Sequence, residues 1–425
     1  MRTTWCAALA ATAALAVPAA AQANDVTHWN RVAMSTLVAF PGPAGGAPPA
    51  LQIHMAMTQG AVYDAVNAIE KQKQRYQPYL LKRHFNPKAS EDAAAATAAY
   101  VVLRNIVSGV PATIVFANRA TLLAALDAEY AASLAAIPDS KSRGKGIDAG
   151  EAAAAAMIAS RQGDGRFGAS QWIPLVGLGY WQPLLNADGT PQLDPTPWVG
   201  GVRPFLVRSS SQFRTAGPNS LSSAIWAAEL NEVRGIGSVN SAIRSPTQTH
   251  NTLFWQSNGG PPLLWNDVAS DLIEGRSIDT ADSARLLGML NLAGADTAIN
   301  CWNDKYFWDF WRPWNAIRLT EPTWTPLLSA PYPDHPSGHL CLDSVHLRVL
   351  TMFFGTDNIP FGVTSSRFGN ETRFFNRFSE PLNEIIETRI WAGLHFRTAD
   401  LQAVTLGENV AGYMAAHYFK PAHKH

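Results

Sequence analysis

The sequence has no excess of either charge, because 33 lysines and arginines balance 33 aspartates and glutamates. It contains no strongly basic run, which argues against a nucleic-acid partner. Beyond the N-terminus it also lacks any run that reaches the roughly 18 apolar residues of a transmembrane helix. We therefore expect a protein that binds no nucleic acid and does not span a membrane.

Cysteine is scarce too, with Cys6, Cys301 and Cys341 as the three examples in 425 residues. Around the first of them, Arg2, an apolar stretch and an Ala-x-Ala ending form the pattern of a secretory signal peptide over residues 1–23. The alternative is a buried N-terminal helix. The signal-peptide interpretation predicts a periplasmic or secreted protein. In that oxidising compartment the two remaining cysteines either form one disulfide or stay as buried thiols.

Strand signals are scarce as well, whereas apolar residues recur at three- and four-residue steps in segments such as Leu51–Lys71. We predict an all-α fold with two four-helix-bundle-like halves, an N-terminal helical region (24–166) and a C-terminal helical region (214–425). Residues 167–213 are dense in proline, glycine and tryptophan and keep no helical or strand period. They predict a long, irregular, aromatic-rich connection between the halves.

The stretch PDHPSGHL places His335 and His339 four residues apart, the spacing of two zinc ligands on one helix face. Pro336 argues against a zinc helix, since proline does not sit in a helix interior. Proline and Gly338 instead favour a tight turn around Ser337, where the backbone can approach a ligand and successive N–H groups can bind an anion. Taken alone, this is also an ordinary turn.

Two other segments of the last third carry cations among apolar residues. In KYFWDFWRP, Lys305 and Arg312 are seven residues apart, which places them on one face of a helix. In TRIWAGLHFRTAD, Arg389 and His395 are six apart, so they approach a small ligand from different sides. Buried cations need an anion beside them. The ordinary alternatives are ion pairs with nearby aspartates and polar residues on a helix surface.

The three segments together form a more specific pattern. Lys-x6-Arg-Pro, then Pro-Ser-Gly-His, then Arg-x5-His, in this order in a helical chain, resembles the superfamily of vanadium-dependent haloperoxidases and type 2 phosphatidic acid phosphatases. The motifs span Lys305 to Asp400, roughly a quarter of the chain. Upstream, MAMTQGAVYDAVNAI and NEVRGIG look like the N-terminal helices of the longer bacterial haloperoxidase-like branch.

The resemblance implies an oxyanion site. Its anion-binding groups would be the following five residues: Lys305, Arg312, Ser337, Gly338 and Arg389. Lys305 would also be catalytic, because its ammonium would polarise the bound peroxide. His395 would be the axial group, either a vanadium ligand or a phosphoryl nucleophile. His339 would be the general acid–base, and His335 a bystander. Vanadate is the implied cofactor, and phosphate fits the same cradle.

Several positions depart from the family patterns or bear on specificity. The phosphatase pattern has an Asp four residues after the axial histidine, but here that position is Ala399. Asp400 comes fifth, about 140° off the face of a regular helix, and cannot orient His395 by that route. Trp302 and Tyr332 occupy the positions of a halide pocket. Convergence of the motifs would also bring the two late cysteines together as a disulfide.

Three functions remain open from the sequence. The first is an exported haloperoxidase-like enzyme that oxidises halide with hydrogen peroxide at histidine-bound vanadate. The second is an exported acid phosphatase that hydrolyses phosphomonoesters through a phosphohistidine intermediate. The third is a non-catalytic oxyanion-binding helical protein. The expected partners are hydrogen peroxide and halide for the first enzyme and a phosphomonoester for the second. The sequence leaves open whether the chain forms a homo-oligomer.

Overall fold

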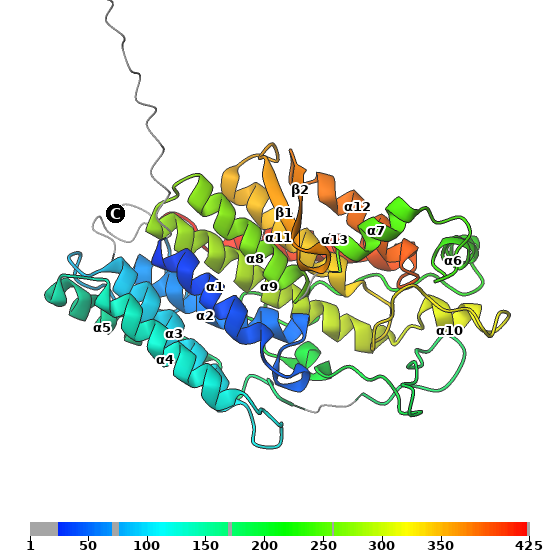
Figure 1. The fold of residues 1–425 in the computed structure, drawn as a ribbon, viewed down its shortest axis with the longest axis horizontal. Helices are drawn as coiled ribbons and strands as arrows, with labels where there is room; N and C mark the ends of the chain where they lie inside the picture. Colours follow the sequence, from blue (N-terminus) through cyan, green and yellow to red (C-terminus); the bar gives the residue numbers. More distant parts are fainter. Residues whose placement is uncertain (1–23, 70–75, 169–171, 257–258, 423–425) are drawn as a thin grey trace, which may run out of the picture.

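The computed structural model describes residues 24–69, 76–168, 172–256 and 259–422 (Figure 1). The signal peptide predicted for residues 1–23 therefore lies outside the described residues. Helices dominate the described part of the chain, and the only named strands there form one two-stranded sheet. The predicted mostly helical fold is confirmed.

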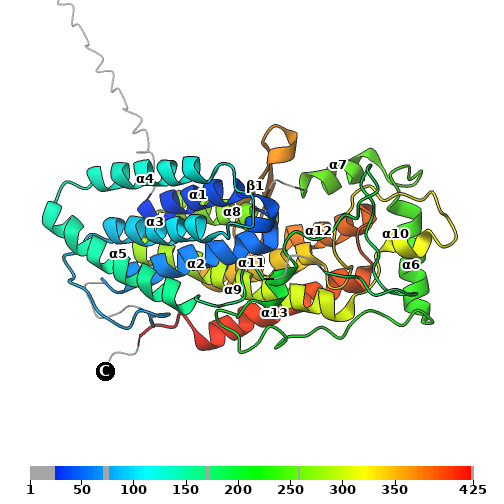
Figure 2. The same ribbon diagram turned by 90° about the horizontal axis from the view of Figure 1, so that it is seen from below.

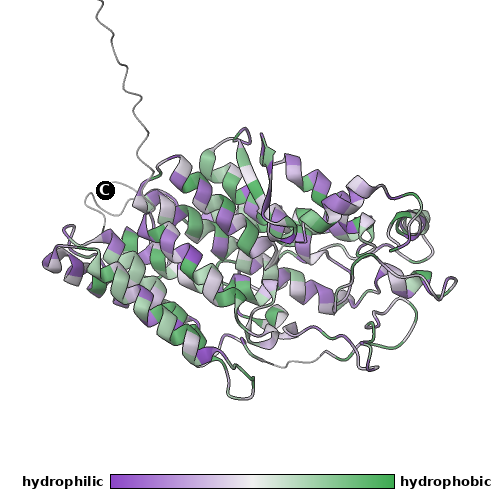
Figure 3. Cartoon of the chain, viewed as in Figure 1, coloured by the Kyte–Doolittle hydropathy of each residue, from purple (hydrophilic) through white to green (hydrophobic). Residues whose placement is uncertain are grey.

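Five α-helices and a short 3-10 helix make up the N-terminal region, on the left of Figures 1 and 2. Their bounds are as follows: α1 (Asp25–Val38), η1 (Gly42–Ala44), α2 (Pro48–Asn67), α3 (Glu91–Gly109), α4 (Arg119–Ala135) and α5 (Ser140–Ser160). All residues of α2 after its first are buried, because this helix is covered on all sides by its neighbours. The outer helix α4 buries only two residues and shows both hydrophilic and hydrophobic residues in Figure 3.

The segment predicted as a connection, 167–213, contains one short 3-10 helix, η2 (Pro197–Gly201), among its described residues. Buried carboxylates fix its path. Asp296 of the next region accepts hydrogen bonds from the backbone amides of Phe205, Leu206 and Val207 at 2.6–2.7 Å. The chain therefore runs over the helices in a defined course without regular structure of its own.

Eight α-helices follow, and several of them meet at the site. Their bounds are as follows: α6 (Ala224–Ile236), α7 (Pro246–Phe254), α8 (Gly260–Gly275), α9 (Thr280–Trp308), α10 (Pro313–Ile317), α11 (Gly338–Phe354), α12 (Glu380–Trp391) and α13 (Arg397–His417). The 29-residue α9 is the central helix, since it packs against α2, α11 and α13. It begins at the Asp279 cap, whose side chain accepts a hydrogen bond from the Asp282 amide.

A β-hairpin is the element that the sequence did not predict. Strands β1 (Phe361–Ser365) and β2 (Glu371–Phe375) pair antiparallel, joined by the short turn η3 (Ser366–Phe368). The alternating burial of β1 is a strand signal, but it covers only five residues and is easily missed. The hairpin turn reaches the mouth of the cavity described below.

The hydropathy of the helices sets one further limit. Within the described ranges, no helix combines the length and the apolar character that a membrane crossing requires.

Candidate active site

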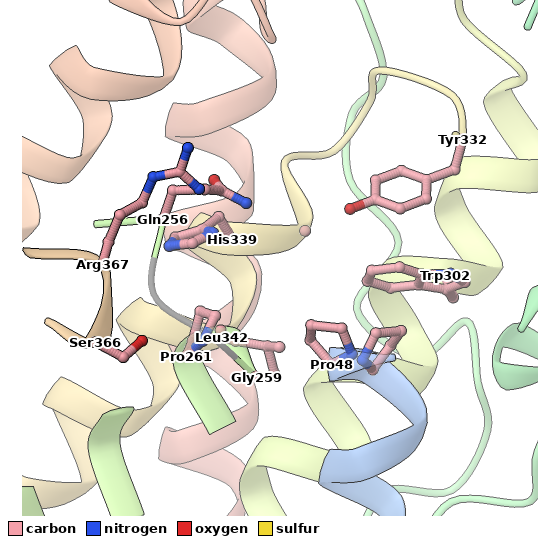
Figure 4. A pocket seen from close by; sticks show the side chains of 13 residues that line it. Pro48, Gln256, Gly259, Pro261, Trp302, Tyr332, His339, Leu342, Ser366 and Arg367 are labelled. Carbon is pink, nitrogen blue, oxygen red and sulfur yellow. The ribbon is translucent and has the colours of Figure 1, made fainter. Parts of the chain in front are cut away.

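A cavity of about 460 Å³ opens where the end of α9, the start of α11 and the hairpin turn η3 meet. Figure 4 shows Trp302 and Tyr332 on one side of it and His339, Gln256 and Arg367 on the other. The residues that the motifs identified lie in its wall or directly behind it, buried by the surrounding helices.

Lys305 sits in the last turn of α9 and is fully buried. Its ammonium donates to the carbonyls of Pro333 and Asp334, both at 3.1 Å, and to that of Pro336. Burial lowers the pKa of Lys305 to about 8. Because an ammonium has three donors, all of them are used by the loop before α11. In this structure Lys305 therefore holds the loop, and its direct contact with an oxyanion stays a prediction.

Arg312 caps α10 and is also fully buried. Its Nε donates to the Tyr332 carbonyl at 2.9 Å, and its Nη1 reaches the Leu394 carbonyl at 2.7 Å and His395 Nε2 at 3.1 Å. Nη2 has no hydrogen-bond partner in the described structure. Burial lowers the pKa of the guanidinium. One donor of Arg312 thus stays available beside His395.

Arg389 comes from the last turn of α12, with 2% of its surface exposed. Its Nη1 lies 3.3 Å from both Gln256 Oε1 and His339 Nδ1. Neither Nε nor Nη2 has a hydrogen-bond partner among the described residues. Like Arg312, Arg389 places unused guanidinium donors in a buried position, where leaving them unpaired is costly.

His395 follows α12 and has a partner on each ring nitrogen. Nδ1 lies 2.8 Å from Asp334 Oδ1, and Nε2 faces the Arg312 guanidinium. A guanidinium only donates, so Nε2 carries the lone pair and Nδ1 the hydrogen, which Asp334 accepts. Burial and the neighbouring cations lower the pKa of His395 well below its usual value. The result is a neutral imidazole whose basic nitrogen lies beside the unused donor of Arg312.

Asp334 is the residue that sequence reasoning missed. Burial raises the pKa of this carboxyl to about 7, and Arg312 and Lys305 oppose that rise. Asp400 makes no hydrogen bond to His395, and the angle expected on a shared helix does not apply, because His395 precedes α13. Asp400 is buried in the first turn of α13, and burial raises its pKa. The sequence feature that could have indicated Asp334 is its place in Pro-Asp-His, directly before the Pro-Ser-Gly-His motif.

Ser337 and Gly338 begin α11. The Ser337 amide donates to the Ala399 carbonyl at 3.0 Å, while its buried hydroxyl lies near Asp400 without a hydrogen bond of good geometry. A Cβ added at Gly338 would lie 2.9 Å from the Trp302 ring, so a larger residue does not fit. The first amides of a helix have no intrahelical acceptor. This turn therefore presents a hydroxyl and helix N-terminal amides as anion donors.

His339 stands in the first turn of α11 and lines the cavity. Burial, and then Arg389, lower its pKa well below the usual value. His335 points elsewhere, with Nε2 at 3.0 Å from Thr215 Oγ1 and its ring against Trp308. Because α11 starts at Gly338, the two histidines do not share a helix, as Pro336 predicted.

Trp302 and Tyr332 form the opposite wall, with ring centroids 5.2 Å apart in an edge-on arrangement. Asp194 of the irregular connection fixes Trp302 by accepting a hydrogen bond from its indole Nε1 at 2.8 Å. Both aromatic side chains line the cavity, as a halide pocket would require.

Cys301 and Cys341 are buried free thiols in the structure, not a disulfide. Their Sγ atoms nevertheless lie 2.6 Å apart, because the end of α9 and the first turn of α11 pack together. Proximity of the two cysteines was expected from convergence of the motifs. The bond itself stays a prediction.

Taken together, the geometry suits an oxyanion. The buried side-chain atoms without a hydrogen-bond partner include donors of three residues at the site: Arg312, Ser337 and Arg389. Guanidinium groups match the oxygens of tetrahedral anions in charge and geometry. A vanadate or phosphate ion placed here would satisfy these donors, with His395 Nε2 as the adjacent base.

Comparison with known families agrees with this site. Residues 285–424 match the family model described as the VCPO second helical-bundle domain, and this range includes the three motifs between Lys305 and Asp400. Over these residues the chain resembles the superfamily of vanadium-dependent haloperoxidases and type 2 phosphatidic acid phosphatases. Among curated proteins, it is similar to the vanadium chloroperoxidase of Curvularia inaequalis, with 24% identity over 196 residues.

That match covers 37% of this chain and 32% of the relative, so the chain aligns with about a third of the fungal protein. Two solved structures are similar over most of their length. The first bacterial vanadium-dependent iodoperoxidase has a TM-score of 0.76 and 20% identity, covering 94% of this chain and 98% of that one. A holo-type bacterial vanadium-dependent chloroperoxidase has a TM-score of 0.71 and 14% identity, covering 93% and 97%. These two proteins share the fold of the chain.

Proposed function

We propose that this protein is an exported, vanadium-dependent haloperoxidase-like enzyme that oxidises halide with hydrogen peroxide. The observation that carries the proposal is the set of unused, buried donors around His395 Nε2, next to a cavity with an aromatic wall. The names of the similar proteins, two chloroperoxidases and an iodoperoxidase, support vanadate over phosphate as the ion that the site serves. Which halide it oxidises stays open.

Vanadate, when bound, supplies a Lewis-acid centre that activates peroxide without changing its own oxidation state. Arg312, Arg389 and the Ser337 hydroxyl would hold its oxygens, and His395 Nε2 is placed to coordinate the metal. Asp334 keeps the hydrogen of His395 on Nδ1, so that Nε2 remains a ligand. The buried cation of Lys305 adds positive charge from behind the loop.

His339 is the residue placed to move protons. It lines the cavity, next to Arg389, and is neutral at ordinary pH because burial lowers its pKa. A neutral imidazole can accept a proton from incoming peroxide at Nδ1 and return it to a leaving oxygen. Trp302 and Tyr332 face the same space and would exclude water around a halide.

An acid phosphatase is the second candidate. One observation of the structure removes the sequence argument against it. The sequence argument against it was Ala399 in place of an orienting aspartate. Asp334 supplies a carboxylate to His395 Nδ1 from a different segment, which is what a phosphohistidine nucleophile needs. The same residues therefore suit transfer of a phosphoryl group to His395 Nε2.

The deciding experiment uses the mature protein after removal of phosphate. Iodide, bromide and chloride oxidation by hydrogen peroxide is measured with and without added vanadate, in parallel with hydrolysis of an aryl phosphate. Vanadate-dependent halide oxidation supports the proposal. Aryl phosphate hydrolysis without any halide oxidation supports the phosphatase, and anion binding without either activity supports the non-catalytic alternative.

His395→Ala provides the matched test of the site. It should abolish vanadate retention, because it removes the only proposed metal ligand. Retention of both vanadate and activity by this variant would contradict the assignment. Periplasmic or secreted location is part of the proposal and is tested by N-terminal sequencing of the exported protein, with Asn24 expected near the start.

A further inference from the structure

Asp343 lies one helical turn after His339 on α11 and is fully buried. Its Oδ1 accepts a hydrogen bond from the Trp265 indole at 2.7 Å. Its Oδ2 lies 3.7 Å from His339 Nε2, which is ion-pair distance and longer than a hydrogen bond. Neither of these two atoms has a hydrogen-bond partner in the described structure. The spacing of four residues places the carboxylate and the imidazole on one helix face.

The other nitrogen of His339 fixes which one carries the hydrogen. Nδ1 lies 3.3 Å from Arg389 Nη1, and a guanidinium has no acceptor, so Nδ1 carries the lone pair. The hydrogen then sits on Nε2, on the side of Asp343. The backbone carbonyl of Trp255 also lies near the imidazole and favours its protonated form. An acceptor beside Nε2, as Asp343 is, favours this tautomer.

The hydrogen bond to Trp265 does not explain why residue 343 is an aspartate. An asparagine would accept the Trp265 hydrogen bond equally well without placing a charge in the core. A buried carboxylate with one unpaired oxygen is costly, and burial raises the pKa of Asp343 to about 7. The unpaired Oδ2 of Asp343 faces Nε2 of His339 at ion-pair distance. Such a cost is typical of functional sites.

We propose that Asp343 is the positioning residue of His339. Its Oδ2 accepts the Nε2 hydrogen and so holds the tautomer in which Nδ1 faces the oxyanion cradle. When Nδ1 takes up a proton, the carboxylate stabilises the resulting imidazolium. This is the relation between the buried aspartate and the histidine of a catalytic triad. It rests on the proposed acid–base role of His339, but it applies equally to the peroxidase and the phosphatase.

The charges around His339 explain why a carboxylate is needed. Arg389 on α12 lies beside Nδ1, and His395 lies in the same site beyond it. Arg367 of η3 lines the same cavity at its mouth (Figure 4). The two arginines oppose an imidazolium at His339, whereas His395 is neutral, and Asp343 supplies the opposite charge from within α11.

The first measurement does not need activity. In phosphate-free protein with ¹⁵N-labelled histidine, the His339 resonances are identified by their loss in His339→Gln. We expect the Nε2–H tautomer in the wild type, and in Asp343→Asn a mixture of tautomers with a lower imidazolium pKa. Asp343→Glu keeps a carboxylate and should keep the wild-type tautomer if it folds.

The second measurement is the pH profile of kcat/KM for whichever activity the wild type shows. Asp343→Asn should reduce kcat/KM by about 10- to 100-fold and move the acidic limb to lower pH, since the pKa of the base falls. Retained vanadate affinity in this variant shows that the cradle is intact.

Unchanged tautomer and imidazolium pKa in folded Asp343→Asn would overturn the proposal and leave the Trp255 carbonyl as a sufficient acceptor. A wild type without either activity would instead contradict the proposed function, while the spectroscopic result still decides the pairing of Asp343 with His339. The two failures are therefore distinguishable.

Discussion

Asp334 Oδ1 lies 2.8 Å from His395 Nδ1 across 61 residues of sequence, in a position where both side chains are buried. The contact joins the loop before α11 to the loop before α13, and it fixes the direction of the basic Nε2. In metal sites, partners of this kind orient the ligand and strengthen its basicity.

Replacement of Asp334 should therefore weaken the site without removing the ligand. We expect Asp334→Asn to reduce vanadate affinity by about 10- to 100-fold, the usual effect of losing such a partner. Equilibrium dialysis of phosphate-free protein measures this affinity. Asp357, which accepts from Ser379 on the surface, provides the control as Asp357→Asn. Equal affinities in the wild type and Asp334→Asn would show that Asp334 has no role in the site.

Gly338 offers a steric test of the cradle. A Cβ there would lie 2.9 Å from Trp302 and 3.5 Å from the Lys305 side chain, so Gly338→Ala must displace the cavity wall. We expect a loss of about 1–3 kcal/mol in unfolding free energy, together with lower activity. The control is Gly109→Ala at the end of α3, where an added Cβ meets nothing within 4 Å. Urea unfolding compares the two, and an equally small effect at both positions would contradict the steric argument.

Lys305 predicts an unusual dependence of stability on alkaline pH. Its pKa falls from 10.5 to about 8 on burial, so between these values the unfolded chain binds the proton and the folded protein does not. Stability rises with pH wherever the unfolded state binds more protons. In phosphate-free buffer, the unfolding free energy of the wild type minus that of Lys305→Met should therefore increase from pH 8 to 10.5. The expected total is about 3 kcal/mol at most. A difference that stays constant or falls over this range would contradict the shift.

The two cysteines give a chemical prediction. Because Cys301 and Cys341 are adjacent and the protein is proposed to be exported, we expect oxidation to a disulfide in the mature protein. Thiol titration of the denatured, unreduced protein should find no free thiol, and two free thiols after reduction. Two titratable thiols before reduction would show that the buried pair stays reduced, as the structure has it.

Much of the site was predictable because its motifs are local. The Pro-Ser-Gly-His turn indicated where a helix begins and which backbone approaches a ligand. The prediction that Lys305 and Arg312 share one helix face was wrong, because α9 ends at Trp308 and Arg312 is the N-cap of α10. The superfamily resemblance then joined three segments that spacing alone cannot bring together. The mostly helical fold followed from the scarcity of alternating segments.

What the sequence did not show depends on tertiary contacts. The carboxylate that orients His395 comes from another loop, so counting along α13 to Asp400 could not find it. The carbonyls that occupy the Lys305 ammonium are backbone groups, which every residue has and no motif marks. The hairpin was missed because each strand has only five residues.

The unused donors of Arg312 and Arg389 also bear on how the protein folds and persists. Each is a buried hydrogen-bonding group without a partner in the described structure, which lowers the stability of the anion-free protein. An oxyanion that fills them binds the folded chain and not the unfolded one, so it acts as a folding ligand; at 100 times its Kd it adds about 2.7 kcal/mol. The melting temperature should then depend on the phosphate or vanadate content of the medium. The supply of phosphate or vanadate thereby becomes a determinant of the lifetime of the folded protein.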